Sequence, residues 1–361
     1  MRSGYATSAC AAAAAAAGIR VLQLGHRLDQ IDIDLPSAKG VVFNLARCEI
    51  DSEGVCCGII KDAGDDPDVT NGIEIQAYVR AVSKAGITLN GGKGVGTVTL
   101  PGLPLAVGEA AINPGPRKLI TRVIQQELSN YQEEMNRGYE ITIQVPDGES
   151  IAEQTMNPKL GIVGGISILG TDGLVRPYSV PAFRTSLYYE LRVAFENGYR
   201  VIGLATGKRS SAYLQDVLHD TEGLGVLDVG DELGYPIEQA VKMGFEKIIV
   251  GGMIGKLSKL AQGRFQTHVN EGEVDFDFLA QVAAGQNAST WLCDRIRSAR
   301  TAHQVQTWLT GEGITIEAEL ARRAAEQVFN HVKKQVSVGV IIFSLNGDLL
   351  GEANIEAAHG E

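Results

Sequence analysis

Residues 199–219 read YRVIGLATGKRSSAYLQDVLH, and this stretch predicts the fold of the carboxyl-terminal half of the chain. Its first part, 199–204, has the length and composition of a buried strand. A loop of glycine, hydroxyl and basic residues follows over 205–211, and the remainder has the pattern of a helix that ends near His219. Strand, glycine loop and helix in this order are typical of a parallel sheet that is covered by helices on both faces.

Similar elements continue along the same half of the chain. We expect helices over 181–196, 237–244 and much of 276–334, and strands over 247–250 and 337–345. Ligands of such sheets bind outside the carboxyl ends of the strands. The loops that follow these strands are therefore the expected place of a ligand in this half.

The amino-terminal half has shorter elements. Alternating or apolar runs predict strands over 41–62, 73–82, 94–100 and 141–145, and helical spacing predicts a helix over 117–137. A short helix expected over 150–156 opens the carboxyl-terminal half. The prolines from Pro101 to Pro116 exclude long regular elements between them. The alanine run is expected to form a helix that Thr7 or Ser8 caps and Gly18 ends.

Length and these patterns predict two domains. The first, over 1–148, is expected to be an α+β domain with glycine-rich and proline-rich loops. The second, over 149–361, is expected to be a parallel-sheet α/β domain whose glycine loops hold a ligand.

The composition excludes several classes of partner. The 32 Lys and Arg against 43 Asp and Glu give a net charge of −11, which argues against nucleic acid, because phosphate-backbone binding needs clustered cations. The five cysteines form no CxxC pair, so we expect neither a disulfide framework nor a zinc site, and a reducing cytoplasm is the natural location. No run approaches the ~18 consecutive apolar residues of a membrane helix, so no membrane partner is expected.

The most informative motif is residues 161–177, GIVGGISILGTDGLVRP. An apolar strand that leads through Gly170-Thr171-Asp172-Gly173 presents backbone N–H groups without side-chain obstruction, which suits a nucleotide or a carboxylate. Asp172 is placed to bond a ribose hydroxyl or an amine. The alternative is a tight turn in which Asp172 caps the chain that follows.

Three groups of polar residues are further candidates. Lys256 and Lys259 share a helix face after a glycine loop, so they either pair with ligand carboxylates or form a solvated face. His268 is the best proton-handling candidate of the second half, although a lone histidine is more often structural. The densest positive cluster of the first half contains Arg117. The other histidines lack the paired spacing of a metal site, so no protein metal site is expected.

Taken in order, several blocks of this sequence resemble one family. They are RSGYAT followed by Cys10 and the alanine tract, VTNGIEI (69–75), GGKGVGTVTLPGLPLAVGEAAINPGPRKLI (91–120), NPKLGIVGGISILGTDGLVRPYS (157–179), GKLSKLAQG (255–263) and FQTH (265–268). The chain resembles the CbiD family, the cobalt-precorrin-5B carbon-1 methyltransferases of anaerobic cobalamin biosynthesis. The blocks span most of the chain.

The resemblance implies transfer of a methyl group from S-adenosylmethionine to carbon 1 of a cobalt corrinoid, giving cobalt-precorrin-6A. It also implies a two-domain α/β protein unlike the common Rossmann methyltransferase fold. The cobalt belongs to the substrate, so the protein needs no metal of its own. The expected partners are the cobalt-corrinoid intermediate, neighbouring enzymes of the cobalamin pathway and a second copy of the chain.

From this reading we predict the site residues. The methyl donor is expected at Gly164, Gly165, Gly170, Thr171, Asp172 and Gly173. The substrate is expected at Thr7, Asn71, Arg117, Arg176 and Lys256, with His268 as an orienting or proton-handling group. A macrocycle edged with carboxylates needs local cations, and those available are Arg117, Lys118, Arg176, Lys208, Arg209, Lys256 and Lys259.

The sequence departs from the family pattern in several loops. Asp172 follows Thr171 where Ser or Thr is expected, Met253 replaces a histidine, and Gly230-Asp231-Glu232 replaces a Gly-Asn-Phe block. The alternative hypothesis is therefore a non-catalytic or altered-specificity relative that binds a corrinoid or another tetrapyrrole. A third hypothesis is an enzyme of another class whose glycine loops hold a nucleotide.

Overall fold

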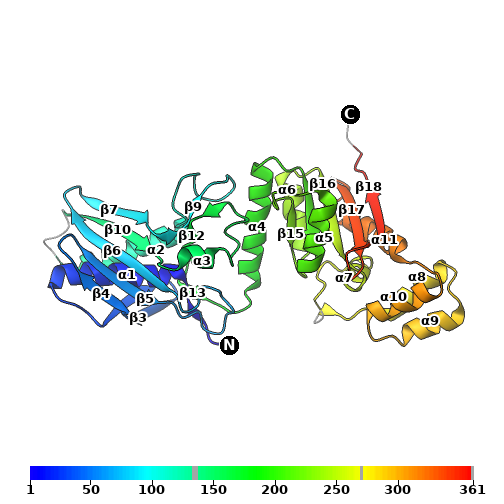
Figure 1. Cartoon of the computed structure of the whole chain (residues 1–361), viewed down its shortest axis with the longest axis horizontal. Helices are drawn as coiled ribbons and strands as arrows, with labels where there is room; N and C mark the ends of the chain where they lie inside the picture. Colours follow the sequence, from blue (N-terminus) through cyan, green and yellow to red (C-terminus); the bar gives the residue numbers. More distant parts are fainter. Residues whose placement is uncertain (132–136, 269–270, 359–361) are drawn as a thin grey trace. The chain divides into compact units, whose positions relative to one another are not determined.

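The computed structural model describes residues 1–131, 137–268 and 271–358. It divides into two compact units, Met1–Val180 and Pro181–Glu361 (Figure 1). The first combines helices with a mixed sheet, and the second contains a largely parallel sheet with helices on both faces. The predicted fold class is confirmed.

The boundary between the units differs from the expected one after residue 148. Residues 149–180 belong to the first unit, because their short strands pair with strands of that unit. These pairs are β11 (Ile162–Val163) with β9 (Thr97–Val98), β12 (Gly165–Ile166) with β8 (Gly94–Val95), and β13 (Leu174–Val175) with β1 (Gly4–Tyr5). The loop at residues 164–173, called the signature loop below, was expected in the second domain but lies in the first.

A five-stranded sheet forms the centre of the first unit. In spatial order its strands are β4 (Arg47–Ile50), β5 (Val55–Ile60), β6 (Glu74–Val82), β10 (Gly138–Gln144) and β7 (Gly86–Gly91). All neighbours are antiparallel except β10 and β7, which run parallel. A hairpin of β2 (Gln30–Leu35) and β3 (Ala38–Asn44) and a short helix, α3 (Gly148–Ala152), complete the unit with the two helices described next.

The alanine run forms the buried helix of this unit. Helix α1 (Thr7–Leu24) packs against β5, β6 and α2 (Pro114–Leu128), and every alanine from 11 to 17 is fully buried (Figure 1). Small side chains allow this close approach of backbones. In length and composition α1 also passes as a membrane span, but 78% of it is buried inside the unit, as in the core helix of a soluble protein.

Three expectations about these helices are wrong. Helix α1 continues through Gly18, which lies against Val79, and it ends at Gly25 in a left-handed conformation. Neither Thr7 nor Ser8 caps it, since Ala6 is the N-cap residue. Pro114 begins α2 rather than excluding it, because the first turn of a helix tolerates proline. Of the helix expected over 117–137, α2 covers the part up to Leu128, and residues 132–136 lie outside the described residues.

The sheet of the second unit has the strand order β15-β14-β16-β17-β18. The strands are β14 (Val201–Ala205), β15 (Val226–Asp228), β16 (Lys247–Met253), β17 (Ser337–Phe343) and β18 (Leu349–Ile355). The first four in space are parallel and β18 is antiparallel. The chain adds β15 on one side of β14 and then crosses to place β16 on the other, so the order reverses between β14 and β16.

Alternating side chains divide the core of this unit into two layers. On one face, α5 (Lys208–Leu218) covers Val226, Ile249 and Ile341. The larger core cluster lies on the other face and includes Ile202, Ile248 and Val340. Its helices are α4 (Val180–Glu196), α6 (Gly234–Met243), α7 (Ile254–Leu260), α8 (Phe276–Gly285), α9 (Thr290–Arg297), α10 (Ala302–Gly311) and α11 (Glu317–His331).

Gly94 provides a test of the close contact between the 94 and 145 segments of the first unit. It has a φ of +71°, and a Cβ there would lie 1.8 Å from the Val145 carbonyl oxygen. Gly25 has nearly the same φ, +73°, with no atom within 4 Å of a Cβ. We expect Gly25→Ala to lower the free energy of unfolding by about 1–2 kcal/mol, the usual cost of this conformation.

Gly94→Ala should lower it by roughly 1–3 kcal/mol more, because backbone must also move. Urea unfolding followed by circular dichroism measures both losses. Equal losses in the two variants would contradict the close contact between the 94 and 145 segments.

Candidate functional site

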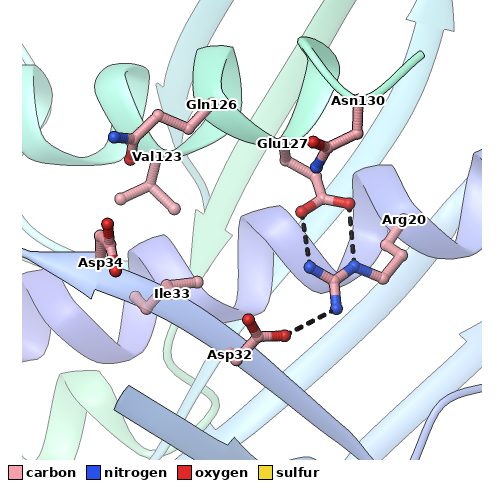
Figure 2. A pocket seen from close by; sticks show the side chains of 8 residues that line it. All are labelled: Arg20, Asp32, Ile33, Asp34, Val123, Gln126, Glu127 and Asn130. Atoms are coloured by element: carbon pink, nitrogen blue, oxygen red, sulfur yellow. Dashed lines mark hydrogen bonds and ion pairs between the residues drawn. The ribbon is translucent and has the colours of Figure 1, made fainter. Parts of the chain in front are cut away.

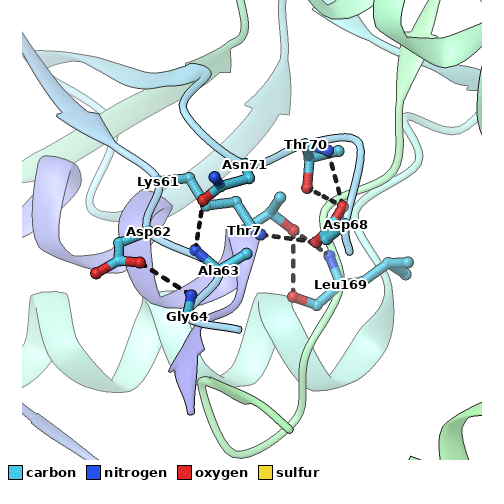
Figure 3. A network of polar contacts seen from close by, with 9 residues as sticks. All are labelled: Thr7, Lys61, Asp62, Ala63, Gly64, Asp68, Thr70, Asn71 and Leu169. Carbon is cyan, nitrogen blue, oxygen red and sulfur yellow. Dashed lines mark hydrogen bonds and ion pairs between the residues drawn. The ribbon is translucent and has the colours of Figure 1, made fainter. Parts of the chain in front are cut away.

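Several predicted site residues meet where α1 begins (Figure 3). The Thr7 hydroxyl donates to the Leu169 carbonyl at 3.2 Å and accepts from the Leu169 N–H at 2.8 Å. The Ser8 hydroxyl donates to the Gly170 carbonyl at 2.7 Å. The start of the chain and the signature loop, which are 162 residues apart, are thus joined directly.

A buried ion pair lies beside this junction. The Lys61 side chain is 1% exposed, and its Nζ is 2.7 Å from Oδ2 of Asp68 (Figure 3). Burial would raise the pKa of Asp68, but hydrogen bonds from Lys61 and Thr70 outweigh it and hold this pKa below its ordinary value. Asn71 joins the same loop, where its Oδ1 accepts from the Ala63 N–H at 2.8 Å.

The signature loop is partly explained by packing. Gly165 lies against the Gly94 backbone, where a Cβ would approach within 2.2 Å. Gly170 and Gly173 contact the start of α1. Gly164 is exposed with open space around it, and Thr171 is exposed near the start of α2. Asp172 accepts from the Leu174 N–H at 3.1 Å through Oδ1, which is the turn contact of the alternative interpretation. The ligand-binding role of all six predicted residues stays a prediction.

The two predicted arginines of this unit have different surroundings. Arg117 donates to three backbone carbonyls, those of Ile112 at 2.8 Å, Leu89 at 3.2 Å and Ala110 at 3.4 Å. It therefore holds the chain before α2 in place. Arg176 is exposed and pairs with Asp172 at 2.7 Å, so its guanidinium is accessible from solvent.

The second unit joins three loops through Lys256. Its Nζ donates to the Thr206 carbonyl at 2.7 Å and the Gly230 carbonyl at 3.3 Å, and it pairs with Asp231 at 3.1 Å. These partners follow β14 and β15, while Lys256 itself follows β16. The ammonium thus ties together the carboxyl ends of three neighbouring strands.

His268 lies at the same edge. Thr267 donates from its hydroxyl to Asp231 at 2.8 Å, and its carbonyl accepts from buried Lys259 at 2.8 Å. Burial would raise the pKa of Asp231, but hydrogen bonds from Thr267 and Lys256, helped by the nearby His268, hold this pKa below its ordinary value. The His268 side chain is exposed beside this carboxylate.

Sequence reasoning missed several partners in these networks. Lys61, Asp68 and the half-buried Asp231 were not among the predicted residues, and Lys259 proves to be a buried structural donor. A lysine at the end of the apolar run that leads to residue 60 was the available signal for Lys61, because such a charge needs a partner.

Two cavities lie outside the networks described above. One, of about 250 Å³, lies between the later turns of α1 and α2 and the β2 hairpin (Figure 2). There Arg20 bonds Glu127 through two nitrogens and Asp32 through the third, and Asp34 also lines the cavity, so carboxylates outnumber the one cation. The other, of about 190 Å³, lies at the carboxyl ends of β16 and β17 between Met253 and Phe343.

Over the described ranges, no group of three His, Cys, Asp or Glu residues is placed to hold a metal ion.

Asp68→Asn tests the buried pair. It leaves Lys61 charged without its partner, so we expect the free energy of unfolding at pH 7 to fall by about 3–5 kcal/mol. The folded-state pKa of Asp68 is lowered, so its contribution is present above the ordinary carboxyl pKa and is lost as pH falls below about 4. Between pH 7 and pH 3 the free energy of unfolding of the variant should therefore fall less than that of the wild type.

Asp62→Asn is the matched control, since Asp62 lies in the same loop in an exposed pair with Arg2. We expect it to change stability by less than about 1 kcal/mol. Denaturant unfolding between pH 3 and pH 7 measures both variants. Equal losses would contradict the special role of the buried pair.

Comparison with known proteins identifies relatives of this sequence. The CbiD family model matches residues 1–177 and the model of the CbiD C-terminal domain matches 266–354. A cobalt-precorrin-5B C(1)-methyltransferase of Geobacillus kaustophilus is 41% identical over 98% of this chain and 95% of its own length. Its counterpart in Priestia megaterium is 39% identical over 98% and 96%.

A solved structure is also similar. A cobalamin biosynthesis protein (CbiD) from Archaeoglobus fulgidus is 28% identical, with a TM-score of 0.41, over 75% of this chain and 84% of that one. The family models and the full-length relatives together identify the group: this chain belongs to the CbiD family.

Proposed function

We propose that this chain transfers the methyl group of S-adenosylmethionine to carbon 1 of cobalt-precorrin-5B and forms cobalt-precorrin-6A. The observation that carries the proposal is the identity of about 40% with methyltransferases of that name across 98% of the chain. That identity extends through both units. We place the reaction in the cytoplasm, with the preceding and following pathway enzymes as partners and a second copy of the chain as a further candidate.

The chemistry needs position more than a protein nucleophile. The electron-rich corrinoid attacks the methyl carbon in line with the carbon–sulfur bond, whose electron pair passes to sulfur and leaves S-adenosylhomocysteine. Holding two reactants in this alignment supplies much of the rate. The protein's task is therefore to bind both molecules and exclude water from them.

We assign the methyl donor to the signature loop, Gly164 to Gly173. Support comes from the exposed backbone at Gly164 and the exposed Thr171, which a ligand can reach. Gly165, Gly170 and Gly173 hold the loop against its neighbours. Asp172, a hydrogen-bond acceptor beside Thr171, is the group for a donor hydroxyl or amine.

Of the predicted substrate residues, some can contact the substrate and others hold the surrounding loops in place. Arg176 and Asn71 are exposed, so they are the groups proposed to meet the corrinoid carboxylates and carbonyls. Thr7, Arg117 and Lys256 already bond the backbone and act by positioning the loops around them. His268, exposed beside Asp231, is proposed to orient the substrate or move a proton.

Methyl transfer is tested directly. The protein is incubated without oxygen with cobalt-precorrin-5B and S-adenosylmethionine that carries a labelled methyl group. We expect label in the corrinoid. Corrinoid binding without transfer would support the non-catalytic carrier instead, and neither binding nor transfer would reject the proposal.

Arg176→Ala tests the assigned contact. We expect about tenfold weaker corrinoid binding with unchanged folding, because a charge-assisted hydrogen bond to a carboxylate is lost. Arg80→Ala is the control, since the half-buried Arg80 likewise pairs with a single carboxylate, that of Glu140. Titration of the corrinoid measures both variants, and equal affinity for the two would remove Arg176 from the site.

A further inference from the structure

Two cysteines of the first unit lie directly opposite each other in its five-stranded sheet. Cys48 belongs to β4 and Cys57 to β5, and the antiparallel register of these strands pairs the two residues. The hairpin, rather than a CxxC spacing in the sequence, brings the two thiols together. Neither cysteine is among the residues assigned to the methyl donor or to the corrinoid.

The pair occupies a place in the ladder that suits a covalent link. The turn of the hairpin is closed by a hydrogen bond from the Asp51 N–H to the Gly54 carbonyl at 3.0 Å. Hydrogen-bonded and non-hydrogen-bonded pairs alternate along an antiparallel ladder, and counted from this bond Cys48 and Cys57 form a non-hydrogen-bonded pair. The Cα atoms of such a pair are about 4.5 Å apart, which lies within the range that a disulfide spans.

The two thiols differ in exposure. Strand β4 is an edge strand of the sheet, and Cys48 is half-buried there. Cys57 is fully buried in the core of the first unit, on a strand that packs against α1. Burial, together with the neighbouring Cys48 side chain, raises the pKa of the Cys57 thiol. An oxidant from solvent therefore reaches Cys48 first.

The adjacent Cys56 provides an internal comparison. Successive residues of a strand point to opposite faces of the sheet, so Cys56 lies on the other face from Cys57. There its thiol donates to Oε1 of Gln76 at 3.9 Å. Although Cys56 and Cys57 are neighbours in the sequence, the register places only Cys57 opposite Cys48.

We infer that Cys48 and Cys57 are a site of reversible oxidation, at which hydrogen peroxide converts the two thiols to a cross-strand disulfide. The Cys48 thiol loses its proton and attacks one oxygen of the peroxide, whose O–O bond breaks, so that a sulfenic acid forms and water is released. The Cys57 sulfur then attacks the Cys48 sulfur, and the S–O bond breaks. The oxygen leaves as a second water with the proton of Cys57, so the thiols lose two electrons and two protons, which the peroxide takes up.

The disulfide protects this part of the core from irreversible oxidation. Without a resolving thiol, a sulfenic acid at Cys48 proceeds to sulfinic and sulfonic acids, which only exceptionally return to the thiol. Such acids are charged and larger than a thiol, and burying them beside Cys57 is unfavourable. The disulfide stops the oxidation at a step that a dithiol reductant reverses.

Peptide analysis after oxidation tests the site. The reduced protein is treated with hydrogen peroxide, and the remaining thiols are alkylated in denaturant. Cleavage after Lys, Arg and Glu separates Cys48 from Cys56 and Cys57, because Glu49 and Glu53 lie between them. We expect mass spectrometry to find the peptides of Cys48 and Cys57 joined by a disulfide, and dithiothreitol to separate them.

Two serine variants identify the partner of Cys48. Cys57→Ser should lose the joined peptides and accumulate sulfinic and sulfonic acids at Cys48. Cys56→Ser is the matched control, one residue away on the other face, and should keep the joined peptides. Circular dichroism before oxidation checks that each variant is folded.

Thermal unfolding provides a second measurement, which does not require a change at the buried Cys57. The disulfide restricts the unfolded chain, so oxidation should raise the unfolding temperature of the wild type by about 5–10 °C. Cys48→Ser, at the half-buried position of the edge strand, should show no such rise.

Several results would overturn the inference. They are unlinked Cys48 and Cys57 after oxidation of the wild type, a disulfide that Cys56→Ser removes, and a product that dithiothreitol does not reduce. Methyl transfer is measured separately, so its presence or absence bears on the proposed function and not on this site.

Discussion

The burial of α1 along most of its length is the constraint on which the first unit depends. A helix whose residues 9–17 are all fully buried must be made of alanine and cysteine, because larger side chains would separate it from β5, β6 and α2. Its beginning is consequently fixed against the signature loop, through Thr7 and Leu169. The position of the glycine-rich signature loop thus follows from the packing of the alanine helix α1.

In the second unit, lysine side chains hold the loops in place. Parallel strands bring their carboxyl ends to one edge, where loops present unpaired carbonyls. Lys256 satisfies two of these carbonyls and one carboxylate, and Lys259 satisfies the Thr267 carbonyl nearby. Lysines that the sequence presents as ligands for substrate are therefore internal supports of the loops, and the loops are what a ligand meets.

Sequence patterns predicted most of the fold because periodicity reports burial. The strand at 74–82 and the helix at 180–196 lie where expected. The strand expected over 247–250 continues to Met253, and the helix expected after the loop 205–211 already begins at Lys208. Patterns missed β15, which has only three residues, and β18, whose outer position leaves it polar. The domain boundary was missed because residues 149–180 pair through strands of two residues, too short for any periodicity to register. The half-buried carboxylates Asp68 and Asp231 depend on contacts that no local pattern contains.

Cations show most clearly why a site is harder to predict than a fold. This chain has a net charge of −11, so a carboxylate ligand must be met by particular residues rather than by the surface as a whole. Several lysines and arginines have the charge that such a ligand needs, yet their side chains are bonded inside the protein. They are Lys61, Arg117, Lys256 and Lys259. Lys208 and Arg209 belong to the same residue types, but their side chains are exposed and have no hydrogen-bond or ion-pair partner within the described part of the chain. Residue type alone therefore does not identify which cations are structural, because that depends on hydrogen bonds and ion pairs that only the fold creates.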